Sequence, residues 1–279
     1  MSNKDRGIPD AEETDQYYDV VNEIFAELWD ENFHHGYWET DEDSSSNREA
    51  CDKLTDLVIE RSGDTSGARL LDVGCSIGLP VFRLAGQSPG VTVVGLSNNA
   101  AQVTEANRRS AELGLGDRVT FDTADALDMP YDDDSFDIVW VFETLPHLDR
   151  LAALKEVNRV LKPGGRVVIG DIYLNAQPNE HDLALVREHE ATNAFSPFLL
   201  EHEYREVIAR SGLELRELKD ISAQTHRTGV RMNETVDERY DELVARYSEE
   251  IIPLLDVVRD PAGRLKEIGY VLVVAHKAE

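Results

Sequence analysis

The sequence predicts an α/β fold in which helices cover both faces of a mostly parallel sheet. From Ala68 onward, short β-branched runs alternate with helical stretches, and this alternation is typical of strand–helix–strand units. A glycine-rich turn at Gly74 directly follows the first apolar run. The length of 279 residues, 41% of them hydrophobic, suggests one large α/β domain with additions or two small domains, and either is ample for a buried core. Together these observations predict a single sheet of seven strands with helical additions.

Each element follows from a local change in the hydrophobic pattern. Strands are predicted at 69–73, 91–96, 119–123, 136–142 and 166–173, and helices between them at 79–87, 98–113 and 150–161. The run 162–165, Lys-Pro-Gly-Gly, stops one helix and precedes the next strand. After residue 173 the alternation lapses into an irregular or helical insert at 175–197. A helix at 199–211, a strand at 213–221, a mostly helical charged stretch at 222–266 and a last strand at 268–276 complete the chain.

The first 46 residues form the most acidic part of the chain, with two basic residues against fourteen acids, a net charge of 2 − 14 = −12. Apolar residues recur at helical spacing between 15 and 30, which predicts an amphipathic helix. Ser46 or Asn47 is positioned to cap the next helix. We therefore divide the chain into a helical lid segment at 1–62 and a core at 63–279. Inserts near 174–198 and 223–266 are expected to join the lid over the carboxyl edge of the sheet.

Composition excludes several classes of protein. A net charge of −27 disfavours nucleic acid as a partner, because the average field repels phosphate. Cys51 and Cys75 are the only cysteines, which excludes a disulfide scaffold and predicts a cytoplasmic location. No apolar run approaches the ~18 residues of a membrane helix, and no secretory signal is expected at residues 1–5 because no apolar stretch follows their charges. A small-molecule partner is expected, and the N-terminal helix could pair two copies of the chain in a homo-oligomer.

The turn after the first strand is the strongest functional signal. It reads Leu70-Leu71-Asp72-Val73-Gly74-Cys75-Ser76-Ile77-Gly78, and a helix begins directly after it. Glycine permits both a sharp turn and close approach of a ligand to the backbone. The following helix offers unpaired N–H groups to a carboxylate or phosphate, and ligands of open α/β sheets bind at this edge. A plain strand–turn–helix corner is the alternative interpretation.

Three further features lie next to the ends or starts of later strands. Gly95-Leu96-Ser97 ends the second strand, and Gln102 lies five residues beyond Ser97. Asp125-Ala126 follows the third strand. Residues 135–140 open the fourth strand, and residues 161–165 precede the fifth. In this order, with the first turn, they resemble the class I methyltransferases that use S-adenosylmethionine (SAM). The resemblance implies a Rossmann-like fold and SAM as the cofactor.

The same resemblance implies which residues hold the cofactor. Asp72, Gly74, Ser76 and Gly78 would surround its methionine end. Leu96, Ser97 and Gln102 would serve the ribose and methionine, Asp125 the adenine amino group and the Ala126 N–H the ring. One departure is Ser76, which replaces the middle glycine of the motif. Serine is tolerable there if the backbone avoids positive φ.

A closer resemblance covers nearly the whole chain. The segments 33–38 (Phe-His-His-Gly-Tyr-Trp), 220–224 (Asp-Ile-Ser-Ala-Gln) and 269–272 (Gly-Tyr-Val-Leu), with Glu143, His147 and Asp171, are similar to the rebeccamycin sugar O-methyltransferase group. It implies a small lipophilic natural-product acceptor. Tyr37 would lie near the methionine group, and Glu143 would line the methionine end or orient His147.

His147 lies just beyond the fourth strand and is the predicted general base for a hydroxyl acceptor, since imidazole suits proton transfer near neutral pH. Asp171 ends the fifth strand and would assist catalysis or simply hydrogen-bond a loop. Pro146 replaces the first histidine of a pair in the resembled group. This keeps open C-methylation of a prenyl or terpenoid alkene, with or without cyclisation, and a non-methylating SAM-binding cyclase. No ligand spacing predicts a metal site, and 132–134 (Asp-Asp-Asp) is interpreted as a solvated turn.

Overall fold

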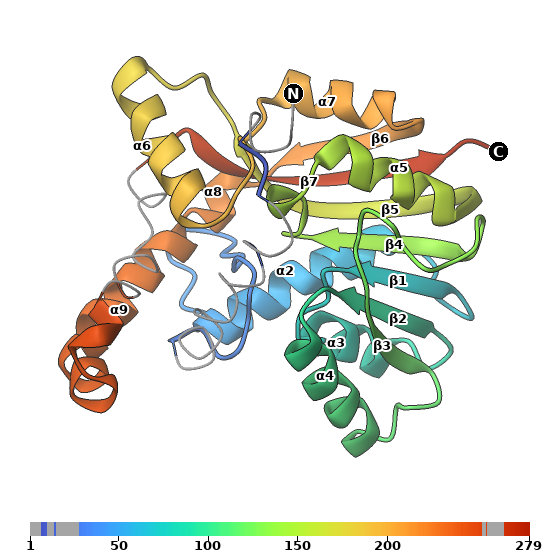
Figure 1. The fold of residues 1–279 in the computed structure, drawn as a ribbon, viewed down its shortest axis with the longest axis horizontal. Helices are drawn as coiled ribbons and strands as arrows, with labels where there is room; N and C mark the ends of the chain where they lie inside the picture. The colour runs from blue at the N-terminus through green and yellow to red at the C-terminus, as the bar shows by residue number, and fades with distance from the viewer. Residues whose placement is uncertain (1–6, 10–13, 15–27, 253–254, 256–264) are drawn as a thin grey trace.

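The computed structural model describes residues 7–9, 14, 28–252, 255 and 265–279, and these form one seven-stranded sheet with helices on both faces (Figure 1). The strands are β1 (Arg69–Val73), β2 (Thr92–Ser97), β3 (Val119–Thr123), β4 (Phe136–Phe142), β5 (Leu161–Leu174), β6 (Leu213–Asp220) and β7 (Ile268–Lys277). The helices are α2 (Asn47–Ser62), α3 (Leu79–Gln87), α4 (Ala100–Glu112), η2 (Leu145–His147), α5 (Arg150–Val160), α6 (Glu180–Thr192), α7 (Glu201–Arg210), α8 (Ser222–Thr225), α9 (Arg227–Tyr247) and η3 (Glu249–Ile251).

The strand order is β3-β2-β1-β4-β5-β7-β6, and only β7 runs antiparallel to its neighbours. The predicted seven-stranded, mostly parallel sheet is therefore confirmed. The direction in which strands are added to the sheet reverses between β1 and β4. Strands β2 and β3 lie on one side of β1, and the chain then returns to place β4 on the other side. Such a switch point leaves a crevice at the carboxyl ends of the strands, where open α/β sheets bind their ligands.

Alternating side chains of the buried strands supply two separate cores. Leu70 joins the core under α2, α3 and α4, whereas Leu71 joins the core under α5 and α7. Both leucines are fully buried, and burial of such a side chain is worth roughly 1.5–3 kcal/mol. Because both faces are covered, the central strands β1 and β4 are nearly continuous apolar runs, whereas the edge strands β3 and β6 mix buried with exposed residues.

The helix ends follow the expected capping chemistry with small shifts. Ser46 caps α2 and shares a reciprocal capping box with Glu49, as one of the two predicted caps. Asn99 caps α4 through the backbone N–H of Gln102. The largest difference lies in β5, which begins at Leu161 rather than 166, because Leu161 pairs with Phe136 before the register shifts.

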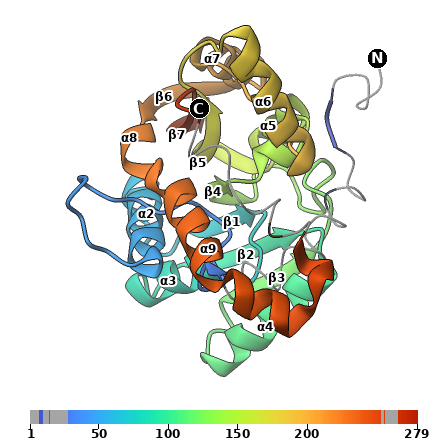
Figure 2. The same cartoon turned by 90° about the vertical axis from the view of Figure 1, so that its left-hand side faces the viewer.

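Helices α6 and α9, from the inserts expected to form a lid, lie beyond the carboxyl ends of the parallel strands, as Figures 1 and 2 show. Trp29 and Trp38 pack with Met232 and Val236 of α9 in a third apolar cluster. The N-terminal lid segment and the second insert therefore share one core. The predicted helix at 15–30 lies almost entirely outside the described residues. None of the described helices has the length and apolar character needed to cross a bilayer.

Candidate active site

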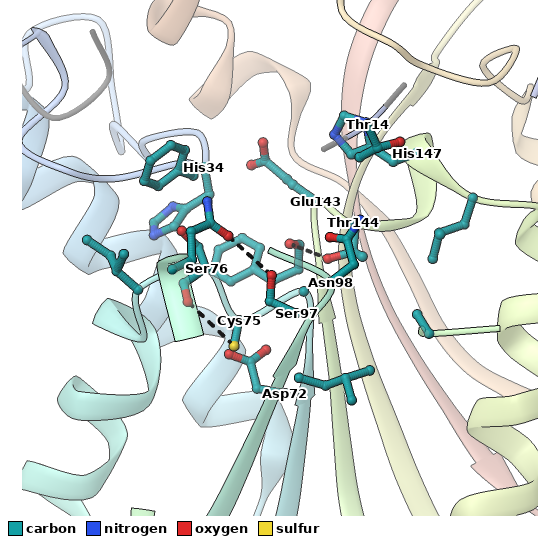
Figure 3. Close-up of a pocket in the computed structure, with 18 of the residues that line it drawn as sticks. Thr14, His34, Asp72, Cys75, Ser76, Ser97, Asn98, Glu143, Thr144 and His147 are labelled. Atoms are coloured by element: carbon teal, nitrogen blue, oxygen red, sulfur yellow. Dashed lines mark hydrogen bonds between the residues drawn. The ribbon is translucent and has the colours of Figure 1, made fainter. Parts of the chain in front are cut away.

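A cavity of about 320 Å³ opens at the carboxyl ends of β1, β2 and β4. Figure 3 shows His34, Glu143 and His147 around its upper part, with Asp72, Cys75 and Ser97 around its lower part. Ten of the thirteen predicted site residues line it: Asp72, Gly74, Ser76, Leu96, Ser97, Gln102, Asp125, Ala126, Glu143 and His147. Tyr37, Gly78 and Asp171 are not among the lining residues.

Gly74 starts the turn that forms the cavity floor, with φ +83°. A Cβ atom there would lie 1.9 Å from the Thr144 Oγ1, and that hydroxyl donates a 2.8 Å hydrogen bond to the Val73 carbonyl. The Leu96 carbonyl holds the turn from the other side, accepting from the N–H groups of Gly74 (2.7 Å) and Cys75 (3.0 Å). The site therefore requires glycine at 74, and Leu96 contributes through its backbone.

The backbone conformation of Ser76 is one that favours glycine. Its φ is +48°, in the left-handed region that L side chains avoid at a cost of roughly 1–2 kcal/mol. Its buried Oγ atom has no hydrogen-bond partner among the described residues. The condition under which serine is tolerable there is therefore not met, because the chain keeps the turn of the glycine motif with a serine in it. The strain and the unsatisfied hydroxyl both lie on the cavity wall.

Gly78 serves the turn rather than the cavity. Its φ is +83°, and a Cβ atom there would lie 2.6 Å from the ring of Phe121. It also stands at the N-terminal cap position of α3. The glycine thus allows the helix to start close against β3.

Asp72 is a buried carboxyl on the cavity wall, 2% exposed and near the end of β1. No described residue donates a hydrogen bond to it. Burial raises the pKa of Asp72 from 3.8 to about 7, because a charged carboxylate is disfavoured away from water. A cation bound in the cavity would offset this penalty.

Ser97 and Gln102 meet at the end of β2, as the sequence motif predicts. The Ser97 hydroxyl donates to the Gln102 Oε1 at 3.2 Å, and both residues are buried. Asp125 follows β3 and is exposed at the mouth of the cavity. Its carboxylate accepts the Leu127 N–H at 2.8 Å, which orients the loop that also carries Ala126.

Glu143 turns its side chain toward the lid and not toward His147. Its φ is +52°, and its carboxylate accepts from the backbone N–H of His35 (2.6 Å) and from His35 Nδ1 (3.0 Å). Burial favours the neutral acid, but the charge and hydrogen bonds of His35 prevail and lower the pKa of Glu143. Glu143 therefore fastens the lid to the end of β4.

His147 is buried (5% exposed) and lines the cavity from η2. Its Nδ1 lies 3.0 Å from the Ala194 carbonyl; since a carbonyl only accepts, Nδ1 carries the proton of the neutral ring and the lone pair is on Nε2. Burial, aided by the charge of Arg150, lowers the pKa of His147 to about 4 although the Ala194 bond opposes this. The imidazole is thus neutral at pH 7 and can accept a proton.

The remaining predicted residues lie behind the cavity wall. Tyr37 is half-buried against the first core, and its N–H bonds to the Ala50 carbonyl. Asp171 is fully buried, and its carboxylate accepts a 2.6 Å hydrogen bond from the Tyr204 hydroxyl. Burial raises the pKa of Asp171 to about 6, against the charge of Arg150 and the Tyr204 hydrogen bond.

Several lining residues were not singled out from the sequence as site residues. Phe33 and Asn32 belong to the lid, and Thr144 follows Glu143 directly. His34, considered only as a lid residue, lines the cavity and stacks on Phe142 with ring centroids 4.4 Å apart. The position of Thr144 directly after a strand end was the one available signal. Among the described residues, no group of three or more potential ligands is arranged to hold a metal ion.

The chain matches known proteins over almost its whole length. A methyltransferase-domain family model matches residues 71–169. Methyltransferase GfsG of Streptomyces halstedii is 35% identical over 96% of this chain and 95% of that protein. The 27-O-demethylrifamycin SV methyltransferase of Amycolatopsis mediterranei is 33% identical over 97% and 99% of the two chains. Among solved structures, the 4+2 cyclase SpnF superposes with a TM-score of 0.85 at 29% identity, over 97% of each chain.

Proposed function

Because the chain belongs to the class I SAM-dependent methyltransferases of natural-product pathways, we propose that it methylates a hydroxyl oxygen of a small lipophilic natural product. The observation that carries this proposal is His147, a neutral buried imidazole whose lone pair is on the nitrogen that does not bond Ala194. A hydroxyl acceptor must lose a proton as it attacks, and such an imidazole can take it.

The described residues fit SAM as the cofactor. A cationic ligand would compensate the buried carboxyl of Asp72, and the unsatisfied Oγ of Ser76 offers a polar group to it. Gly74 keeps the floor open at backbone level. SAM supplies a methyl group already activated on a sulfonium. Asp72, Ser76, Ser97, Gln102 and Asp125 would bind and orient it.

The chain's own contribution is then mainly orientation. Holding the acceptor oxygen and the methyl group in line can supply on the order of 7 kcal/mol of the barrier or more. Phe33, Phe142 and Leu148 give the cavity apolar walls, which suits a lipophilic acceptor and excludes water. No described lining residue is Lys or Arg, so no basic pocket offsets the acidity of the chain. An uncharged acceptor fits this wall better than a phosphorylated one.

The test is incubation with methyl-labelled SAM and a panel of lipophilic alcohols, phenols and terpenoids. Label on oxygen supports the proposal. Label on carbon would favour alkene methylation, and product formed without label would favour a cyclase; either would contradict it. Replacement His147→Ala should lower kcat by a factor of about 10²–10⁴. His202→Ala is the control, because His202 is exposed on α7 and does not line the cavity.

The pH–rate profile gives a second measurement. Since burial lowers the pKa of His147 to about 4, kcat/KM for the acceptor, measured at saturating SAM so that Asp72 does not contribute, should stay level down to about pH 5 and fall below that as the imidazole is protonated. An inflection near 6.5, the usual value of a solvated histidine, would contradict the burial argument.

A further inference from the structure

We infer that Arg150 is a positioning residue for His147: it fixes residues 194–197, and these hold the imidazole in the tautomer that can accept a proton. The inference rests on the proposed role of His147 as the base. We call residues 194–197 the strap. It follows α6, the helix of the first lid insert, and joins this insert to the catalytic edge of the sheet.

The strap holds His147 from two sides. The Ala194 carbonyl accepts from Nδ1 at 3.0 Å, and the Phe195 ring lies against the imidazole with centroids 4.9 Å apart. The N–H of Ser196 donates to the Pro146 carbonyl at 2.5 Å. Displacement of Ala194 would free the ring to rotate and to carry its proton on either nitrogen. The strap therefore determines both the direction and the tautomer of the base.

Arg150 ties the strap to the start of α5, three residues after His147. Its Nη1 donates to the Ser196 hydroxyl at 2.7 Å and to the Pro197 carbonyl at 2.8 Å, and the side chain is 6% exposed. Ala194 adopts φ +51°, which is unfavourable for alanine and persists only where neighbours impose it. The two guanidinium bonds are contacts that can impose this conformation.

Asp171 completes the arrangement as the counter-charge of Arg150. Its Oδ2 lies 3.9 Å from the Arg150 Nε, while Tyr204 donates to the same oxygen. The Nε and Nη2 atoms of Arg150 make no hydrogen bond to described residues. Asp171 thus compensates a buried charge rather than touching the reacting atoms. This assigns it a positioning role, one step further from the cavity than Arg150.

The experiment compares variants of the full chain by 15N NMR of His147 and by steady-state kinetics. Arg150→Lys keeps the charge but loses the planar fork, and Ser196→Ala removes one strap bond. Both should give mixed His147 tautomers at pH 7 and an unchanged KM for SAM. We expect kcat to fall about 10- to 100-fold in Arg150→Lys and several-fold in Ser196→Ala. Arg187→Lys and Thr192→Ala, on α6 before the strap, are matched controls and should resemble the wild type.

A single tautomer and wild-type kcat in folded, SAM-binding Arg150→Lys would overturn the inference. If Arg150→Lys does not fold, Ser196→Ala decides the question alone, because it leaves the buried charge pair intact. The NMR measurement needs no acceptor. If the wild type methylates no hydroxyl, the proposed function fails, while the tautomer comparison still supports or overturns the positioning role.

Discussion

Asp72 is buried and no described residue donates a hydrogen bond to its carboxyl, which makes the pH dependence of stability a direct test of the cofactor site. Raising the pKa of Asp72 from 3.8 to about 7 corresponds to roughly 4 kcal/mol of destabilisation when the carboxyl is ionised, at about 1.4 kcal/mol per pH unit. The side chain is 2% exposed, so solvent screening does not reduce this figure much. Asn removes the charge and keeps the shape of the neutral acid.

The sign follows from proton uptake. Between pH 4 and 7 the folded protein holds a proton on Asp72 that the unfolded chain has lost, so wild-type stability falls as pH rises. The free energy of unfolding of Asp72→Asn should not show this fall with rising pH. The difference in free energy of unfolding between Asp72→Asn and the wild type should therefore grow by roughly 2–3 kcal/mol in favour of the variant between pH 5 and pH 8. Urea denaturation of the SAM-free proteins measures it, and the exposed residue Asp128 supplies the control Asp128→Asn.

The cofactor gives the second half of the test. A cationic ligand favours ionised Asp72, so SAM binding near pH 6 should release a proton, and calorimetry in buffers of different ionisation enthalpy detects it. Asp72→Asn should bind SAM more weakly and release fewer protons when SAM binds. A pH-independent difference in stability between variant and wild type would refute the burial argument. Unchanged SAM affinity in the variant would instead remove Asp72 from the cofactor site.

Two further predictions concern the floor and the lid of the cavity. Ser76→Gly should raise the free energy of unfolding by about 1 kcal/mol, because glycine relieves the strain of the positive φ. Calorimetry should show SAM affinity reduced several-fold, because the hydroxyl is lost. Stronger SAM binding would exclude the hydroxyl from the cofactor site. Arg109 holds the lid residue Glu31 with two bonds, of 2.6 and 3.0 Å, so Arg109→Gln should speed release of demethylated cofactor up to about fivefold in stopped-flow measurements. Arg108→Gln breaks only pairs within α4, and an equal effect of both variants would contradict a role for the Glu31 contact.

The positions of the strands could be predicted well from the sequence, because the apolar pattern that marks a strand is local. Strands buried on both faces must be apolar throughout, so their positions were predicted within about two residues, apart from the start of β5. There the Pro163-Gly164 pair suggested a break, but pairing of Leu161 with Phe136 extends the strand. The cofactor motif was recognisable for the same reason, since Gly74, Ser97 and their neighbours act within one turn of the chain.

The parts of the site that could not be predicted depend on contacts between distant segments. Glu143 meets His35 across 108 positions, and Arg150 meets Ser196 across 46. No spacing rule reveals such a pair. Asp171 illustrates the consequence: an acid expected at a strand end suggests catalysis, yet β5 continues to Leu174 and Asp171 is buried beside Arg150. Only the three-dimensional arrangement separates a residue that touches the acceptor from one that holds its neighbour.

Backbone strain is concentrated around the cavity. Glu31, Ser76 and Glu143 line it with positive φ angles, and Ala194, which also has positive φ, bonds His147. Each costs roughly 1–2 kcal/mol and persists only where other contacts enforce it. Arg109 holds Glu31, His35 holds Glu143 and the strap contacts hold Ala194. The Ser76 Oγ has no hydrogen-bond partner among the described residues, so Ser76 is the strained position at which bound cofactor has the most to contribute to local order.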